Sequence, residues 1–330
     1  MRCSAGIPRL ALAMAAALEV GFAGPLSFQT VPFAINNQGQ ISGFSSDIAG
    51  THGFIDTNGI FTVIDVPGST DTLAYGINDA AQVIAFDNTH SKSYLFTGGH
   101  LLDIGVPGST YTWAEGINDA GDIVGAFGDG RRAWGYVDHA GVITRLEVPG
   151  SIETDPYAIN NQGQIVGRYV TITSAGVVAD HGFLYSNGAF ITLDVPGAEL
   201  TDATGINDAG QIVGSFGITE NGAFHGHGFL FYQGIFTTID YPGSPDTDVR
   251  GINNIGQIVG AIGNRTGFLD NAGVFAPIEE PATAFTPEPK SFLLLAGALA
   301  VLPRRKPRLF LPNASRNRPK ITPATRTLSC

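Results

Sequence analysis

The chain is poor in charge and in cysteine. Charged residues make up 14 % of its 330 residues, too few for a long coiled coil, and hydrophobic residues make up 43 %, too many for a fully disordered chain. Cys3 and Cys330 stand at the two ends, so the body has neither a disulfide nor a thiol site. Residues 24–286 hold 27 acidic and seven basic residues, a net charge of −20, which argues against nucleic-acid binding.

Short motifs of common catalytic sites are missing as well. There is no Gly-x-Ser-x-Gly elbow, phosphate-binding loop, His-Glu-x-x-His or paired-cysteine motif. The histidines His52, His181 and His227 recur in separate repeat units, whereas zinc needs ligands that converge on one ion. The sequence therefore predicts no catalytic residue, no cofactor and no metal, and it favours a non-enzyme.

The N-terminus has the order of a secretory signal. Arg2 and Arg9 precede an apolar run, Leu10 to Leu18, and small residues follow up to Ala23. A basic start, an apolar centre and a small-residue cleavage site define a signal peptide, so we expect residues 1–23 to direct export.

The C-terminal region carries a second signal in three ordered parts. Pro287, Glu288 and Pro289 are followed by an apolar run at 291–302 and then by a basic cluster that includes Arg304 and Arg305. Twelve apolar residues are fewer than the roughly 20 of a membrane-spanning helix, and the basic residues favour the cytoplasmic side.

This triplet resembles the PEP-CTERM sorting signal of Gram-negative bacteria. The resemblance implies that residues 282–306 form a sorting segment with a short apolar helix, in which 291–302 enters the membrane only transiently. It also implies an exosortase-type protease as partner and a mature protein that is extracellular or on the outer cell surface. Residues 307–330 are predicted to be a basic, disordered tail.

The body is built from an internal repeat. Segments of the type Gly-Ile-Asn-Asp-Ala-Gly-Gln-Ile-Val-Gly recur six times, with spacings of 42, 40, 42, 47 and 46 residues between their isoleucines. A Val-Pro-Gly motif, which is Tyr-Pro-Gly in the last case, precedes five of these isoleucines, and its proline always lies ten residues upstream. A third motif, His-Gly-Phe or a degraded form of it, lies between each Ile-Asn segment and the Pro-Gly segment that follows it. The repeated isoleucines are Ile35, Ile77, Ile117, Ile159, Ile206 and Ile252.

Each unit predicts two β-hairpins. Asn58-Gly59 is a hairpin-turn signal, and the Asn-Asp-Ala-Gly stretches favour a turn that ends on a left-handed glycine. Ala81 replaces that glycine in one unit, so the turn there should be strained or differently shaped. Four short strands in each of six units predict an all-β fold, a β-propeller of six four-stranded blades within 24–281, with an open β-solenoid as the alternative. The sequence leaves open whether each hairpin groups with its predecessor or its successor, and hence whether the chain ends share one blade.

The repeat resembles the HAF-type probable extracellular repeat of bacteria. The resemblance rests on the Ile-Asn-[Asp/Asn]-x-Gly-Gln-Ile-Val-Gly and His-Gly-Phe-Leu patterns between Phe28 and Ile278. It implies an exported repeat protein and no established reaction.

Residues that break the repeat are the candidates for function. Trp113 and Trp134 are the only tryptophans, and Arg131 and Arg132 adjoin the second. Tryptophan stacks on sugar faces and arginine pairs with carboxylates, so we predict a ligand site at these four residues. The two segments of most variable length, 170–180 and 217–226, are expected to be irregular loops. The preferred function is non-catalytic binding of polysaccharide or a surface protein, and the alternative is a secreted polysaccharide hydrolase or lyase.

Overall fold

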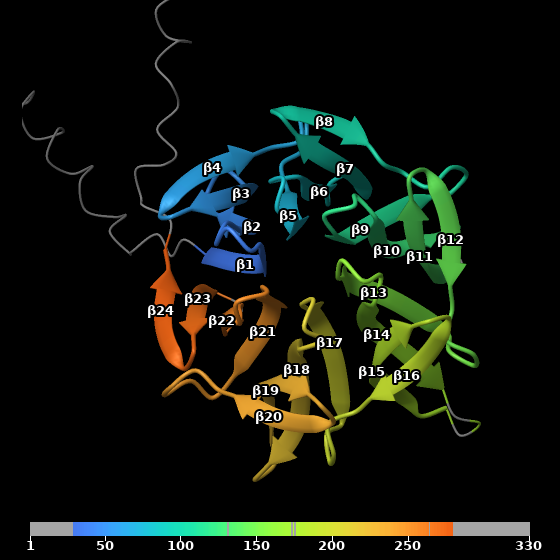
Figure 1. The fold of residues 1–330 in the computed structure, drawn as a ribbon, viewed down its shortest axis with the longest axis vertical. Helices are drawn as coiled ribbons and strands as arrows, with labels where there is room; N and C mark the ends of the chain where they lie inside the picture. The colour runs from blue at the N-terminus through green and yellow to red at the C-terminus, as the bar shows by residue number, and fades with distance from the viewer. Residues whose placement is uncertain (1–28, 131, 173, 175, 264, 280–330) are drawn as a thin grey trace, which may run out of the picture. The chain divides into compact units, whose positions relative to one another are not determined.

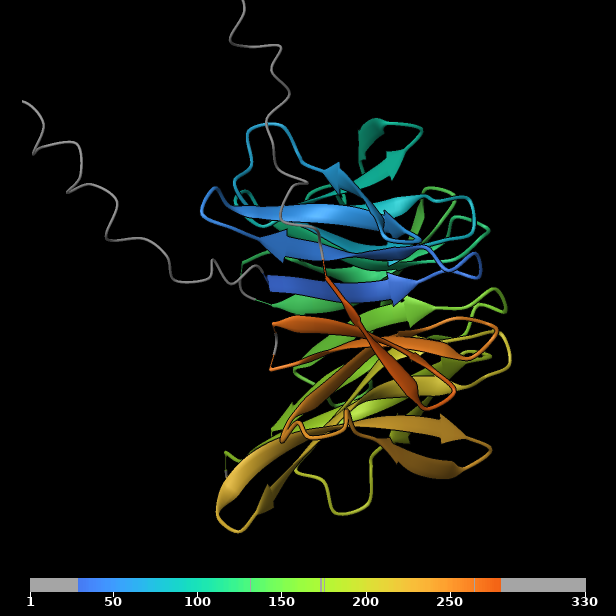
Figure 2. The same ribbon diagram turned by 90° about the vertical axis from the view of Figure 1, so that its left-hand side faces the viewer.

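A computed structural model describes residues 29–279 apart from 131, 173, 175 and 264. These residues form 24 β-strands and no helix, as the short alternating runs and frequent turn residues predict. The strands surround a central axis and run from one face of the ring to the other (Figures 1 and 2).

The first three blades contain twelve strands of four to seven residues. Blade 1 consists of β1 (Gln29–Ile35), β2 (Ile41–Ser46), β3 (Thr51–Thr57) and β4 (Ile60–Ile64). Blade 2 consists of β5 (Thr72–Ile77), β6 (Val83–Asp87), β7 (Lys92–Thr97) and β8 (His100–Asp103). Blade 3 consists of β9 (Tyr111–Ile117), β10 (Ile123–Gly128), β11 (Ala133–His139) and β12 (Val142–Leu146).

The other three blades follow the same plan, with longer central hairpins in blades 4 and 5. Blade 4 consists of β13 (Glu153–Ile159), β14 (Ile165–Ile172), β15 (Val178–Ser186) and β16 (Ala189–Leu193). Blade 5 consists of β17 (Leu200–Ile206), β18 (Ile212–Glu220), β19 (Ala223–Tyr232) and β20 (Ile235–Ile239). Blade 6 consists of β21 (Thr247–Ile252), β22 (Gln257–Ile262), β23 (Thr266–Asn271) and β24 (Val274–Ile278).

Strand pairing decides the grouping that the sequence left open. Within each blade, four consecutive strands pair antiparallel, so the hairpin with the Ile-Asn motif joins the hairpin that follows it. The first and last blades are both complete, and among residues 29–279 no strand from one end of the chain joins the blade at the other end. They meet where Thr30 donates its N–H to the carbonyl of Arg265, 3.1 Å away. The fold is a β-propeller, and the ring closure excludes the open solenoid.

Buried asparagines tie each blade to the next. The side-chain Nδ2 of each repeated Asn donates to the main-chain carbonyl of the equivalent Asn in the following blade, at 3.0–3.2 Å. The last of these bonds runs from Asn253 back to Asn36, so the six form a closed ring. The asparagines are 3–4 % exposed, which makes this ring a buried polar network with its bonds satisfied. Its members are Asn36, Asn78, Asn118, Asn160, Asn207 and Asn253.

A second ring lies one residue further along each turn. There the main-chain N–H of each residue donates to the side-chain Oδ1 of its counterpart in the next blade, at 2.7–2.9 Å. The Ile-Asn-[Asn/Asp] motif thus closes the propeller through two hydrogen-bonded rings. The members of the second ring are Asn37, Asp79, Asp119, Asn161, Asp208 and Asn254.

The turn with alanine keeps its shape at the cost of strain. Ala81 adopts φ +55°, in the left-handed region, and its N–H bonds to Asn78 as the glycine of the other units does. A non-glycine residue there costs roughly 1–2 kcal/mol. We expect Ala81→Gly to raise the free energy of unfolding by about 1 kcal/mol in urea denaturation. Ala80→Gly, one residue earlier and outside the left-handed region, is the matched control and should lower it slightly.

Between neighbouring blades, the core consists of aliphatic side chains with buried aromatic rings among them in five of the six clusters. The phenylalanine of the His-Gly-Phe motif is fully buried in four blades, and Tyr136 takes its place in blade 3. Burial of each ring contributes about 2–3 kcal/mol. The four phenylalanines are Phe54, Phe183, Phe229 and Phe268.

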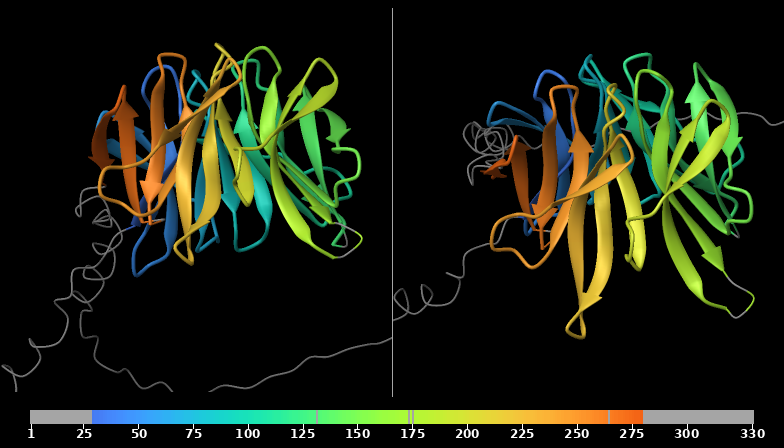
Figure 3. Two further views of the ribbon diagram at one scale, coloured as in Figure 1. Left: turned by 90° about the horizontal axis from the view of Figure 1, so that it is seen from below. Right: turned by 60° about the horizontal axis from the view of Figure 1, so that its bottom comes forward.

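The prediction of irregular loops at 170–180 and 217–226 was wrong. Strands β14 and β15 stay paired out to Ile172 and Val178, and β18 and β19 out to Glu220 and Ala223. Both segments are mostly regular hairpins, which project from the ring (Figure 3). The spacing of the repeats shows that these segments are longer, but it does not show that the extra residues extend paired strands.

Candidate ligand-binding cavity

A β-bulge interrupts the innermost strand of every blade at the same repeat position. One residue, two before the repeated isoleucine, has no partner on the next strand; in blade 2 the following glycine is unpaired too. Bulges commonly re-aim a side chain beside functional sites. Here all six bulged residues line one cavity of about 710 Å³ on the propeller axis. They are Phe33, Tyr75, Glu115, Tyr157, Thr204 and Arg250.

A repeated glycine opposite the bulge explains why the strands can distort there. A Cβ added to Gly125 would lie 2.1 Å from the carbonyl oxygen of Trp113, so only glycine fits against the inner strand. Blade 2 has Ala85 at this position, and there the register is lost over two residues instead of one. The Ile-Val-Gly part of the motif therefore supports the bulge that aims a side chain into the cavity.

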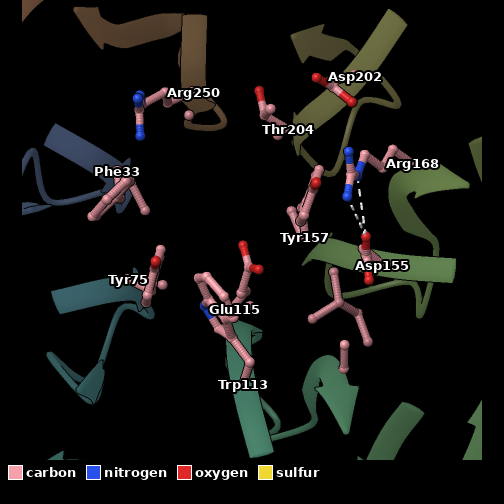
Figure 4. A pocket seen from close by; sticks show the side chains of 18 of the residues that line it. Phe33, Tyr75, Trp113, Glu115, Asp155, Tyr157, Arg168, Asp202, Thr204 and Arg250 are labelled. Atoms are coloured by element: carbon pink, nitrogen blue, oxygen red, sulfur yellow. Dashed lines mark hydrogen bonds and ion pairs between the residues drawn. The ribbon is translucent and has the colours of Figure 1, made fainter. Parts of the chain in front are cut away.

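One arc of the cavity wall is aromatic. Phe33 and Tyr75 stack with ring centroids 4.4 Å apart, and Trp113 stacks on Phe86 at 4.8 Å. Trp113 remains 38 % exposed, so part of its indole is open to a ligand. Phe33, Tyr75 and Trp113 come from blades 1, 2 and 3 and lie on the same side of the cavity in Figure 4.

The opposite arc carries charge. Arg168 contacts three carboxylates, those of Asp155 at 3.0 Å, Asp180 at 3.4 Å and Glu153 at 3.6 Å. Arg250 pairs with Asp248 at 2.6 Å. Figure 4 shows Arg168 bonded to Asp155 across from the aromatic residues. Both arginines of the lining are therefore neutralised by side chains of the protein itself.

Three carboxyl groups of the cavity ionise with difficulty. Burial, followed by the charge of Asp155, raises the pKa of Glu115 well above its usual range. Burial also raises the pKa of Asp155 and of Asp202 to about 6. The Oδ1 atom of Asp202 is buried with no hydrogen-bond partner among the described residues. Groups that titrate near neutrality can exchange protons with a ligand or bind a cation.

Six isoleucines separate this cavity from the asparagine rings. Ile35, Ile77 and their four counterparts line both the large cavity and a smaller one of about 80 Å³, which the ring residues surround. From the isoleucines the large cavity extends to Asn88 and Ser91, in the turn between β6 and β7. A ligand would therefore enter from the face that carries the β6–β7 turn.

The structure separates the four residues that the sequence grouped as a ligand site. Trp113 lines the cavity, whereas Trp134 lies on the third strand of blade 3 and is not part of the lining. The guanidinium of Arg145 lies 4.5 Å from the Trp134 ring centroid, and Arg132 pairs with Glu147 at 3.3 Å. Arg131 lies outside the described residues. Ligand binding at any of them stays a prediction.

The recurrent histidines and acids have a local structural role. Three blades place the histidine Nδ1 2.9–3.0 Å from the carboxylate two residues before the Val-Pro-Gly proline: His52–Asp65, His181–Asp194 and His227–Asp240. These acids therefore pair with histidine. A repeated threonine, five residues after the proline, caps the end of the strand. In five blades its Oγ1 accepts the N–H of the residue before the proline, at 2.8–3.1 Å. The threonines are Thr72, Thr112, Thr154, Thr201 and Thr247.

Sequence reasoning missed the bulged residues and their neighbours. The signal that could have found them is variability. The position before Gly/Ala-Ile-Asn is aromatic in three blades and Glu, Thr or Arg in the others, while the Gly/Ala, Ile and Asn that follow it repeat. A second variable position, four before the isoleucine, supplies Trp113, Asp155, Asp202 and Asp248 to the same cavity.

Comparison with known proteins supports the fold alone. No family model and no curated protein sequence matches the chain. Among solved structures, TolB from Acinetobacter baumannii is similar with a TM-score of 0.52 and 15 % identity, over 78 % of this chain and 65 % of that one. The β-propeller domain of the trilobed protease from Pyrococcus furiosus is similar with a TM-score of 0.47 and 12 % identity, over 78 % and 83 %. At 15 % identity, the similarity to TolB supports a shared fold and no function.

The predicted signal peptide at 1–23 and the sorting residues Pro287, Glu288, Pro289, Arg304 and Arg305 lie outside the described residues. Within residues 29–279 as described, no helix is long and apolar enough to cross a membrane. In the same part of the chain, no group of three or more histidine, cysteine, aspartate or glutamate side chains is placed to hold a metal ion.

Proposed function

We propose that this is an exported propeller of the cell surface or extracellular matrix that binds a polysaccharide in its central cavity. The observation that carries the proposal is the contrast between constant and variable positions. The repeated residues build strands, turns and rings, whereas the bulged residues differ and all line one cavity. Aromatic faces beside carboxylates and hydroxyls suit a sugar, which has apolar ring faces and polar edges.

The proposed location of the protein rests on two sequence signals, one near each end of the chain. A basic start with an apolar run at 10–18 supports export, and the order of Pro287 to Pro289, apolar run and arginines supports processing by an exosortase-type protease. A surface location would bring the cavity into contact with exopolysaccharide.

Retention on immobilised polysaccharides tests the proposal. The full-length protein is incubated with a panel of bacterial and plant polysaccharides, and retained protein and released reducing ends are measured together. We expect retention without release. Trp113→Ala should weaken retention about tenfold, since buried aromatic contacts often contribute more than 1 kcal/mol. Trp134→Ala is the matched control and should bind normally. If it alone abolished retention, the site would lie at the third strand of blade 3, outside the cavity.

A polysaccharide hydrolase or lyase is the second candidate. Glu115 has no acidic counterpart in the other blades, whereas Asp155 shares its position with Asp202 and Asp248; both line the same cavity and have raised pKa values, as a carboxyl that donates a proton requires. Glycosidases use two such groups about 5–10 Å apart. Release of reducing ends that Glu115→Gln abolishes would establish this activity in place of simple binding.

A further inference from the structure

The central cavity is closed at one end. The six repeated isoleucines, which separate it from the asparagine rings, are each only 6–7 % exposed, so within the described part of the chain they leave no passage along the axis wide enough for a sugar. The smaller cavity behind them has a volume of about 80 Å³, well below the roughly 300–1,000 Å³ of pockets that hold a small-molecule ligand. A polysaccharide therefore cannot thread through the propeller from one face to the other.

Walls surround the cavity between this closed end and the mouth, which is its open end on the face that carries the β6–β7 turn. The inner strand of every blade contributes to the lining, so the walls continue around the axis (Figure 1). Strand β9 lines the cavity from Tyr111 near the mouth to Ile117 at the closed end, seven residues that extend about 20 Å at the rise of a β-strand. A volume of about 710 Å³ lies within the range for one small-molecule ligand. The cavity can thus hold a short piece of a sugar chain.

The bulged side chains lie at the closed end. Each stands two positions before its isoleucine, and Figure 4 shows the six side chains around one space. On β9 the bulged Glu115 is four residues from Tyr111, which places it about 13 Å below the mouth. Trp113 lies between the two. A chain that lay across the mouth would therefore not reach the variable residues by which this cavity differs from a plain repeat.

From this geometry we infer that the cavity recognises the end of a sugar chain, which enters through the mouth and places its terminal sugar against the bulged side chains. The inference rests on the proposed function and names its ligand as a chain end. An internal segment continues in both directions, whereas the cavity opens in only one, so such a segment could not reach the closed end without bending back on itself.

Fractions of one polysaccharide separate chain ends from internal segments. The polysaccharide of the panel that retains the protein most strongly is cut by mild acid hydrolysis, and the chain ends of each fraction are counted by methylation analysis. Each soluble fraction then competes with the immobilised polymer for the full-length protein. We expect a fraction with about ten times more ends per gram to halve retention at about a tenfold lower concentration by mass.

The outcomes of this competition are distinct. Equal potency of all fractions by mass, or weaker potency of those with more ends, would overturn the inference and leave the proposed function standing. No retention on any polysaccharide of the panel would contradict both. The measurement uses the unmodified protein, so it does not depend on whether a variant folds.

A bulky side chain at the closed end gives a second test. Thr204 is the smallest of the six bulged residues and donates to the carbonyl of Val249 at 2.8 Å, so Thr204→Trp fills the deepest part of the cavity at the cost of one hydrogen bond. We expect retention to weaken at least about tenfold. Thr237→Trp makes the same change at an exposed position of β20 in the same blade and should bind normally.

Urea denaturation shows whether both tryptophan variants are folded. Full retention by a folded Thr204→Trp protein would overturn the inference, and if Trp113→Ala still weakened retention, the polysaccharide would bind nearer the mouth and the proposed function would stand. Loss of retention in Thr237→Trp would contradict the assignment to the cavity.

Discussion

Replacing Asn207 with alanine is expected to lower the free energy of unfolding by about 3 kcal/mol. Its side chain is 3 % exposed, accepts the N–H groups of Ala209 and Gln211, and donates to the Gln211 side chain and to the carbonyl of Asn253. The substitution leaves buried donors and an acceptor without partners, and each costs about 1–3 kcal/mol. It also breaks the closed ring between blades 5 and 6. Urea denaturation at neutral pH measures the change.

Asn254→Ala is the control for this prediction. Asn254 is exposed in the second ring, where it accepts the N–H of Asp208 and donates to that residue's carboxylate. Since water can replace both bonds, the loss should be below about 1 kcal/mol. Equal losses in the two variants would show that the buried ring is not what holds neighbouring blades together.

The sequence predicts the strands and their number because periodicity and turn chemistry are local. Asn58 and Gly59 both adopt positive φ, as the hairpin signal requires, and each Ile-Asn segment ends a strand. The grouping of hairpins into blades is different, because each hairpin has a possible partner on either side in the chain. It becomes visible only in the pairing between the two hairpins of a blade, as where β2 pairs with β3 and β22 pairs with β23.

The candidate site was harder to predict for a related reason. A rare residue such as Trp134 is conspicuous in the sequence, yet it lies away from the cavity against Arg145. Glu115 and Thr204 are ordinary residues, and what gives them a role is a bulge that turns both toward the axis. The bulge depends on pairing with the next strand, so residue type alone does not reveal it.

Replacing Arg168 with methionine is expected to destabilise the protein by about 3 kcal/mol at pH 7.5. Asp155 is 8 % exposed and would be left as a buried carboxylate without its cation, a change that typically costs 3–5 kcal/mol. The pKa of Asp155 is already raised to about 6, and removing the nearby positive charge raises it further. Urea denaturation from pH 5 to 7.5 follows the effect.

The sign of the pH dependence follows from that raised pKa. A carboxyl whose pKa is higher in the folded than in the unfolded protein adds stability below the unfolded pKa, and this contribution is lost as the pH rises through the folded value. The loss in Arg168→Met should therefore be largest above pH 6 and shrink toward pH 5. Adding Asp155→Asn should restore most of the stability at pH 7.5, because no charge is then left buried.

Arg132→Met is the matched control, since Arg132 pairs with Glu147 at the exposed surface and should contribute less than about 1 kcal/mol. A loss in Arg168→Met that is the same at pH 5 and pH 7.5 would assign Arg168 to packing. If Asp155→Asn restores the stability that Arg168→Met loses, the charge of Arg168 stabilises the fold by pairing with Asp155. Because its guanidinium is held by Asp155, Asp180 and Glu153, Arg168 would then be unavailable to pair with an anionic ligand in the cavity.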